Sequence, residues 1–186
     1  VYAMCAPATE GQFGKDISMS AIRVALKKLG FTDMVEVGLG GDMTAAYEAL
    51  EWSEARKEGK KMTTSCCPAF INLLKMHFPD QYHENMSETL SPMAAVSRYL
   101  KAIHPDCVTV FIGPCMAKKS ESQEMGIEGN ADYVLSFGEF SSLLRSKDVQ
   151  LEAEVSPYQE ASLWGKNFAS SGGVANAVME CMRERG

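Results

Sequence analysis

Short apolar runs alternate along this chain with longer runs in which apolar residues recur every three or four positions. We expect strands in the short runs, which cover residues 1–4, 34–41, 62–65, 107–113 and 133–137. We expect helices in the longer runs, which cover residues 18–31, 44–59, 68–78, 91–103, 138–146 and 171–185. Strands that alternate with helices are typical of βαβ units. The sequence therefore predicts an α/β fold with a mainly parallel, twisted sheet flanked by helices.

Local signals mark the ends of several of these elements. Residues 38–41 predict a glycine-rich exit from the second strand, and Asp42 is expected to cap the following helix. Pro68 stands at the first position of a helix, where its missing N–H costs nothing. Residues 149–168 have no clean period, so we expect a surface excursion there.

Composition limits the class of protein. A chain of 186 residues, 46% of them hydrophobic, can form one good core or two small lobes. A formal net charge of −6 and a pI near 5.1 argue against nucleic acid and favour protein or small-molecule partners. No apolar run is long enough for a bilayer, and the start of the chain lacks the pattern of a signal peptide. We therefore expect a cytoplasmic protein that does not bind membranes.

Three cysteine-bearing segments follow predicted strands. They are Cys5–Ala8 after the first strand, Ser65–Pro68 after the third and Gly113–Lys119 after the fourth. Ligands of parallel sheets bind beyond the carboxyl ends of the strands. We therefore expect these segments to converge on one site.

The thiols in these segments suggest an iron-sulfur site. Cys67 precedes a helix that begins with Pro68, and free N–H groups at a helix start favour a thiolate. Cys115 follows a strand and a proline in a similar way. Two thiolates are half of a four-cysteine cluster site. The alternative is that these cysteines are small hydrophobic core residues, as free cysteines often are.

The remaining polar residues suggest movement of protons or binding of anions. Cys66 need not bind the same metal as its neighbour and could donate or accept a proton. Glu48 and Glu51 lie three positions apart and therefore on one helix face. They could form a proton relay, or they could be part of a solvated acidic face. Either Lys118 or Lys119 could hold an anionic ligand. For Ser87 and Ser91, helix capping is the alternative.

Together these segments resemble the catalytic domain of iron-only (FeFe) hydrogenases. The resemblance rests on Thr64–Pro68, Pro114–Glu121, Ala6–Ala8 and Ser171–Val174, which occur in the family's order along essentially the whole chain. It implies that Cys67 and Cys115 are two of four ligands of a cubane 4Fe-4S cluster. It implies that Cys66 passes protons to a di-iron subcluster, the other part of the H-cluster.

The resemblance also assigns roles to other residues. Glu48, Ser87 and Glu51 would continue the proton relay toward the surface, and Lys118 would bind a cyanide on iron. The residues that would contact the cofactor are Ala6, Pro7, Ala8, Ser65, Ser91, Pro114 and Lys118.

The chain departs from the family pattern at three places. Gly113 replaces a methionine and Met93 a glutamine, as in divergent subgroups that include sensory members. The family's third motif, with two further cysteines, is not found. We therefore expect part of a catalytic domain, with a first lobe over about 1–115 and an incomplete second lobe over about 116–186. We expect such a chain to be inactive alone and to hold no complete active centre, with the case of no bound cluster left open.

The first functional hypothesis is reversible oxidation of dihydrogen to protons and electrons. Its partners would be a ferredoxin-like electron carrier and hydrogenase maturation proteins. The second hypothesis is a non-catalytic relative, either a hydrogen sensor or an iron-sulfur assembly protein. Cys66, Glu48 and Glu51 argue against the assembly class, whose eukaryotic members lack these groups. A third hypothesis is a cluster-free binding module with structural cysteines.

Overall fold

Four parallel strands form one sheet in the computed structural model, which describes residues 1–153 and 160–185. The strands are β1 (Tyr2–Cys5), β2 (Asp33–Glu36), β3 (Thr109–Gly113) and β4 (Tyr133–Ser136), and their order across the sheet is β2-β1-β3-β4. Cys5 pairs with Glu36 on one side and with Ile112 on the other. The carboxyl ends of β1, β2 and β3 therefore lie side by side, and the predicted parallel sheet is confirmed.

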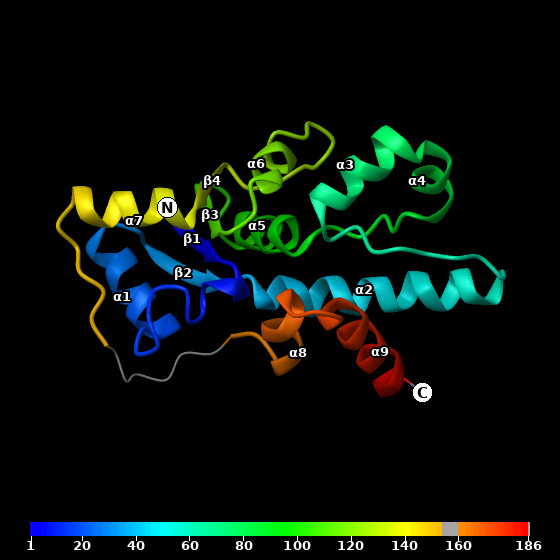
Figure 1. The fold of residues 1–186 in the computed structure, drawn as a ribbon, viewed down its shortest axis with the longest axis horizontal. Helices are drawn as coiled ribbons and strands as arrows, with labels where there is room; N and C mark the ends of the chain where they lie inside the picture. Colours follow the sequence, from blue (N-terminus) through cyan, green and yellow to red (C-terminus); the bar gives the residue numbers. More distant parts are fainter. Residues whose placement is uncertain (154–159, 186) are drawn as a thin grey trace.

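Helices cover both faces of the sheet (Figure 1). The α-helices are α1 (Met19–Lys28), α2 (Gly38–Lys57), α3 (Pro68–His77), α4 (Pro79–Asn85), α5 (Pro92–Ile103), α6 (Ala117–Ser122), α7 (Phe137–Ser146), α8 (Leu163–Lys166) and α9 (Gly173–Arg185). Two 3-10 turns, η1 (Pro7–Thr9) and η2 (Asn167–Ala169), complete the described elements. The long α2 extends beyond the sheet, with α8 and α9 along one side and the α3–α4 pair beyond its other side.

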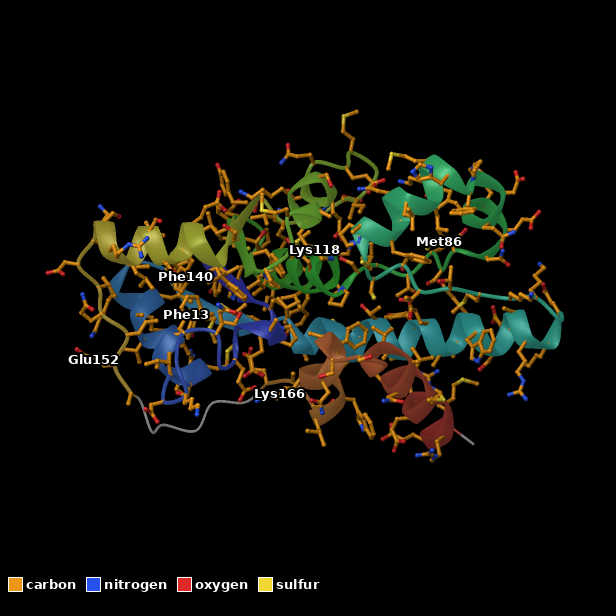
Figure 2. All side chains as sticks on the ribbon, viewed as in Figure 1. Phe13, Met86, Lys118, Phe140, Glu152 and Lys166 are labelled. Atoms are coloured by element: carbon orange, nitrogen blue, oxygen red, sulfur yellow. The ribbon has the colours of Figure 1, made fainter. Side chains whose placement is uncertain are left out.

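Alternation along the strands divides the core into two layers. Ala3 and Cys5 face the layer of α1 and α7, where Phe13 packs edge-on against Phe140 (Figure 2). Met4 and Phe111 face the opposite layer, which contains the buried side of α5. Successive side chains of a strand point to opposite faces, so each short strand contributes to both layers.

The segment 62–65 is not a strand, contrary to the sequence prediction. Its one ladder contact is an isolated bridge between Thr63 and Met86. Thr63 donates its N–H to the Asn85 carbonyl at 2.7 Å, and Ser65 donates its N–H to the Glu48 carboxylate at 3.1 Å. Its backbone groups thus bind the 85–87 segment and a side chain instead of a neighbouring strand of the sheet. The cysteine pair therefore follows an extended loop.

The glycine-rich segment 38–41 is not the exit of the second strand either, because it forms the first turn of α2. A Cβ added at Gly40 would overlap the Pro92 carbonyl oxygen, and one added at Gly38 would lie 2.7 Å from the Ala161 Cβ. Close helix packing, rather than a turn, explains these glycines. Asp42 consequently lies inside α2 and caps nothing there; its carboxylate accepts hydrogen bonds from Ser162, at 2.8 Å from the backbone N–H and 2.5 Å from the hydroxyl.

Most other predicted elements are confirmed, with shifts of a few residues at their ends. The predicted strand over 107–113 begins only at Thr109, so Cys107 precedes it and is half-buried. The helices α4, α6 and α8 were not expected. Residues 149–168 include α8, and the part of the predicted excursion at 154–159 lies outside the described residues. The division into two lobes near residue 115 stays a prediction.

Candidate functional site

The two neighbouring cysteines occupy different environments. Cys67 is the N-cap of α3, with Pro68 in the first helical position as predicted, and it is exposed. Cys66 is half-buried and packs against the cluster of Ala45, Phe168 and Ala177. Burial raises the pKa of the Cys66 thiol, against an opposing hydrogen bond from Thr64. One thiol therefore faces outward and its neighbour faces the interior.

Glu48 lies behind Cys66 and is only 2% exposed. Its Oε1 accepts a hydrogen bond from the Thr64 hydroxyl at 2.6 Å and one from the Ser65 N–H at 3.1 Å. Burial raises the Glu48 pKa, although hydrogen bonds from Thr64, Ser65 and Ser87 act in the opposite direction. Thr64 thus links the Cys66 thiol and the Glu48 carboxyl.

A second carboxyl continues this line toward the surface. The Ser87 hydroxyl donates to Glu51 Oε2 at 2.5 Å and also interacts with Glu48. Glu51 and Ser87 line an open cleft of about 260 Å³ at the outer end of the line, together with Glu54. The structure therefore brings the sequence-predicted Cys66, Glu48, Ser87 and Glu51 into one row between the interior and this cleft.

A separate polar cluster surrounds Lys118, which lies near the centre of the molecule (Figure 2). Its Nζ forms a buried ion pair with Glu121 Oε2 at 2.6 Å and donates to the Cys66 carbonyl at 3.4 Å. The buried Ser91 hydroxyl donates to the other oxygen of Glu121. Ser91 also caps α5 as expected, because its oxygen accepts the Ala94 N–H at 3.3 Å.

Of the other candidates, Ser65 is buried and its hydroxyl donates to the Thr89 carbonyl. Ser65, Ser91 and Glu121 also line a larger cleft of about 630 Å³, bordered by residues of α3, α4 and α6. Lys119 lies apart from this cluster, because it pairs with Glu139 at 2.6 Å on the surface.

The two segments at the ends of β1 and β3 touch each other. Ala6 donates its N–H to the Ile112 carbonyl at 2.9 Å, and Pro7 and Ala8 form the η1 turn that follows. A Cβ added at Gly113 would lie 2.6 Å from Phe111 Cε1 and 3.1 Å from the Ala6 Cβ. Pro114 is exposed and Cys115 is half-buried. The predicted convergence holds for these two segments directly, and the Lys118–Cys66 hydrogen bond joins the cysteine loop to them.

The donor set fits only part of an iron-sulfur centre. A cubane cluster has four thiolate ligands, whereas Cys67 and Cys115 would supply two. Within the described residues, no group of three or more Cys, His, Asp or Glu lies together in a way that could hold a metal ion. A cluster at this position would therefore need ligands beyond those described.

Comparisons with known proteins decide the family. The sequence profile of the family described as "Iron only hydrogenase large subunit, C-terminal domain" matches residues 1–185. The chain belongs to the iron-only hydrogenase family. Iron hydrogenase 1 of Clostridium pasteurianum is 26% identical over an alignment 191 residues long, which covers 92% of this chain and 33% of that protein.

Solved hydrogenases have the same fold. The apo FeFe-hydrogenase from Chlamydomonas reinhardtii, solved as a variant, is 26% identical with a TM-score of 0.71, over 87% of this chain and 46% of that one. A FeFe-hydrogenase structure reporting stepwise H-cluster assembly is 25% identical with a TM-score of 0.76, over 98% of this chain and 52% of that one. The chain thus spans about a third of the curated relative and about half of the solved structures.

Two residues of the site were assigned no role from sequence. Thr64 lies between Cys66 and Glu48, and Glu121 binds both Lys118 and Ser91. Both stand inside the motifs that carry the family resemblance. Their position there was the only sequence signal, because hydroxyls and carboxylates are common on surfaces and their partners come from other segments.

The described helices give no sign of a membrane segment, because none of them is both long enough and apolar enough to cross a bilayer.

Proposed function

We propose that this chain forms the part of an iron-only hydrogenase catalytic domain that supplies a proton relay and two cluster ligands. The reaction is the reversible oxidation of dihydrogen to protons and electrons. The observation that carries the proposal is the row of hydrogen-bonded groups from Cys66 through Thr64 and Glu48 to Ser87 and Glu51, directly beside Cys67. Side-chain acids and bases in hydrogen-bond reach of one another are what proton transfer requires.

In this proposal Cys67 and Cys115 hold a 4Fe-4S cluster together with ligands beyond the described residues. When bound, the H-cluster supplies the redox chemistry. This chain's residues then bind and orient it: Lys118 as a cationic donor, and Ala6, Pro7, Ala8, Ser65, Ser91 and Pro114 as the surrounding wall. Cys66 holds a proton at its sulfur, and Thr64 connects that sulfur to Glu48.

The partners follow from the reaction. A ferredoxin-like carrier would exchange electrons with the bound centre, and maturation proteins would supply its di-iron part. The cytoplasmic location expected from sequence remains part of the proposal.

Exchange of Cys66 tests the relay most directly. Cys66→Ser in the full reading frame, after anaerobic maturation, should lower hydrogen turnover by at least about 10²-fold, because general acid-base groups contribute about that much. Its iron content should equal that of the wild type. A matched exchange at the half-buried Cys107, which packs against a different core cluster, should leave turnover intact. If Cys66→Ser lost its iron instead, the roles assigned to Cys66 and Cys67 would be reversed.

A second candidate function is a hydrogen-sensing relative. It is favoured by Gly113, where the Phe111 ring and Ala6 leave no room for the side chain that many catalytic members carry. A sensor would bind the cluster with the same dependence on Cys67 but turn over hydrogen slowly in the wild type. Turnover of the wild-type protein with an artificial electron donor therefore separates the two candidates.

A further inference from the structure

Lys118 is held by contacts that need no metal. Its ammonium is buried, with side-chain exposures of 11% for Lys118 and 5% for Glu121, and the two side chains form an ion pair at 2.6 Å. An ammonium group has three N–H donors. Two of them have partners here, Glu121 Oε2 and the Cys66 carbonyl oxygen. Within the described part of the chain, the third has no hydrogen-bond partner.

Glu121 is itself fixed from several directions. Its Oε1 accepts the Ser91 hydroxyl, whose own oxygen is occupied by the Ala94 N–H. Its backbone carbonyl accepts the Asn130 side-chain amide at 2.7 Å. Because both carboxylate oxygens are bound to buried donors, the carboxylate has a defined orientation. The ion pair with this carboxylate in turn fixes the position of the Lys118 ammonium.

The contacts of Lys118 connect the two segments that carry the candidate cluster ligands. Its side chain binds the carbonyl of Cys66, which precedes Cys67, and its backbone N–H donates to the Cys115 carbonyl at 3.3 Å. The loop around Cys66 has no strand pairing beyond the isolated bridge at Thr63, so side-chain contacts at Ser65 and Cys66 contribute to its position. A buried ammonium bound to a carboxylate provides a strong contact of this kind.

We propose that Glu121 is the positioning residue of this site: through Lys118 it fixes the cysteine-pair loop against the Cys115 segment before any metal binds. One N–H of Lys118 stays available for an anionic ligand. The role toward a metal centre rests on the proposed function, but the positioning itself does not.

Glu121→Gln tests this positioning in the metal-free protein. The amide can keep the contact with Ser91 but leaves the ammonium without a counter-charge, so Lys118 should leave its place. Hydrogen exchange of the four backbone amides within residues 64–68, where Pro68 has none, should then accelerate at least about tenfold, because a strong charge-assisted contact is lost. Acetylation of Lys118 by an N-hydroxysuccinimide ester, followed by peptide mass spectrometry, should accelerate as well.

Glu124→Gln is the matched control, because Glu124 lies three positions further on and pairs with the more exposed Lys75 at 2.9 Å. It should change neither readout. Lys118→Met should loosen residues 64–68 as much as Glu121→Gln, and the double variant no more than either, since both act through one network. Ser91→Ala removes the hydrogen bond to Glu121 and the N-cap hydrogen bond of α5, but it leaves the Lys118–Glu121 ion pair in place. It should give a smaller effect at the same place if Glu121→Gln does not fold.

Unchanged exchange at residues 64–68 in the folded Glu121→Gln protein would overturn the proposal. An equal acceleration in β1 and β3 would also overturn it, because Glu121 would then stabilise the whole fold rather than position one loop. Neither readout depends on iron, so a chain that binds no cluster would contradict the proposed function and leave this measurement valid.

Discussion

Glu48 is a carboxyl group almost without solvent contact, and its titration should be visible in the stability of the protein. Burial raises its pKa above the ordinary value of 4.5 in the folded state. Below that ordinary value the group is protonated whether folded or unfolded, and its contribution to stability is complete. As the pH rises through the raised pKa, folding must bury a charge, and this contribution is lost.

We therefore predict that Glu48→Gln gains stability relative to the wild type as the pH rises from 4.5 to 8. The amide cannot ionise, so it escapes the cost of burying a charge. Urea unfolding at several pH values measures the difference. Glu54 is exposed on the same helix, so the free energy of unfolding of Glu54→Gln should depend on pH as that of the wild type does. If the free energy of unfolding of Glu48→Gln also ran parallel to that of the wild type, Glu48 would not be buried as a charge.

The sequence predicted the residues of this row better than it predicted their surroundings. Glu48 and Glu51 were expected on one helix face, and the structure agrees. Thr64 and Glu121 received no role, because a hydroxyl or a carboxylate acquires its function from partners that come from another segment. Nothing in a single sequence states which of several serines or glutamates a buried lysine will meet.

At the scale of elements, the glycines at the start of α2 allow close approach of two helices. Gly40 faces the first turn of α5, where a Cβ would overlap the Pro92 carbonyl oxygen and meet a methyl of Val96. Because α5 carries Ser91 at its N-cap, this contact also places part of the candidate site.

Gly40→Ala should destabilise the protein by about 1–3 kcal/mol, as expected for overpacking. In an open helix the same exchange would stabilise by roughly 0.5–1 kcal/mol. Gly138→Ala in α7 is the matched control, because the nearest atom to its added Cβ is Ser136 Oγ at 4.0 Å. Chemical denaturation of both variants measures the difference, and an equal response at the two positions would refute the packing argument.

The glycine run also explains why one element was misread from sequence. Glycines after an apolar run ordinarily mark a turn, so residues 38–41 were expected to be the glycine-rich exit of the second strand. Tertiary packing against α5 and residues 161–165 overrides this local preference. The prediction for segment 62–65 was also wrong. Its residues suit a strand, but its backbone binds the 85–87 segment, and the Glu48 carboxylate accepts the Ser65 N–H.

At the scale of the whole molecule, the sheet and the long α2 position different parts of the candidate site. Parallel strands place Ala6 and Gly113 side by side. The helix α2, which carries Glu48 and Glu51, extends away from the sheet (Figure 1). The alternation of strands and helices predicted this architecture from sequence. The position of α3 and α4 away from the sheet could not be predicted from sequence. Few residues of these two helices are buried, and their position depends on the loops that connect them.

Arg23 and Lys27 of the first helix both form ion pairs with Asp33 of the sheet. Arg23 binds Asp33 at 2.5 Å, and this hydrogen bond lowers the Asp33 pKa to about 2. The depressed pKa contributes stability that is present above the ordinary value of 3.8 and is lost as the pH falls toward 2.

Asp33→Asn should therefore lower stability by about 1 kcal/mol at pH 7, a modest value because both side chains are partly exposed. The deficit relative to the wild type should shrink between pH 4 and pH 2, as followed by thermal unfolding. A deficit that stays constant over this range would show that the charge of Asp33 contributes nothing.

The central claim is that two neighbouring cysteines have different tasks, with Cys67 binding iron and Cys66 moving protons. Iron and acid-labile sulfide per chain, measured after anaerobic reconstitution of the full reading frame, test it most directly. We predict about four irons per chain for a cubane cluster in the wild type and in Cys66→Ser, and a large loss in Cys67→Ala and Cys115→Ala. Equal iron in all four proteins, or a loss in Cys66→Ser alone, would contradict the claim.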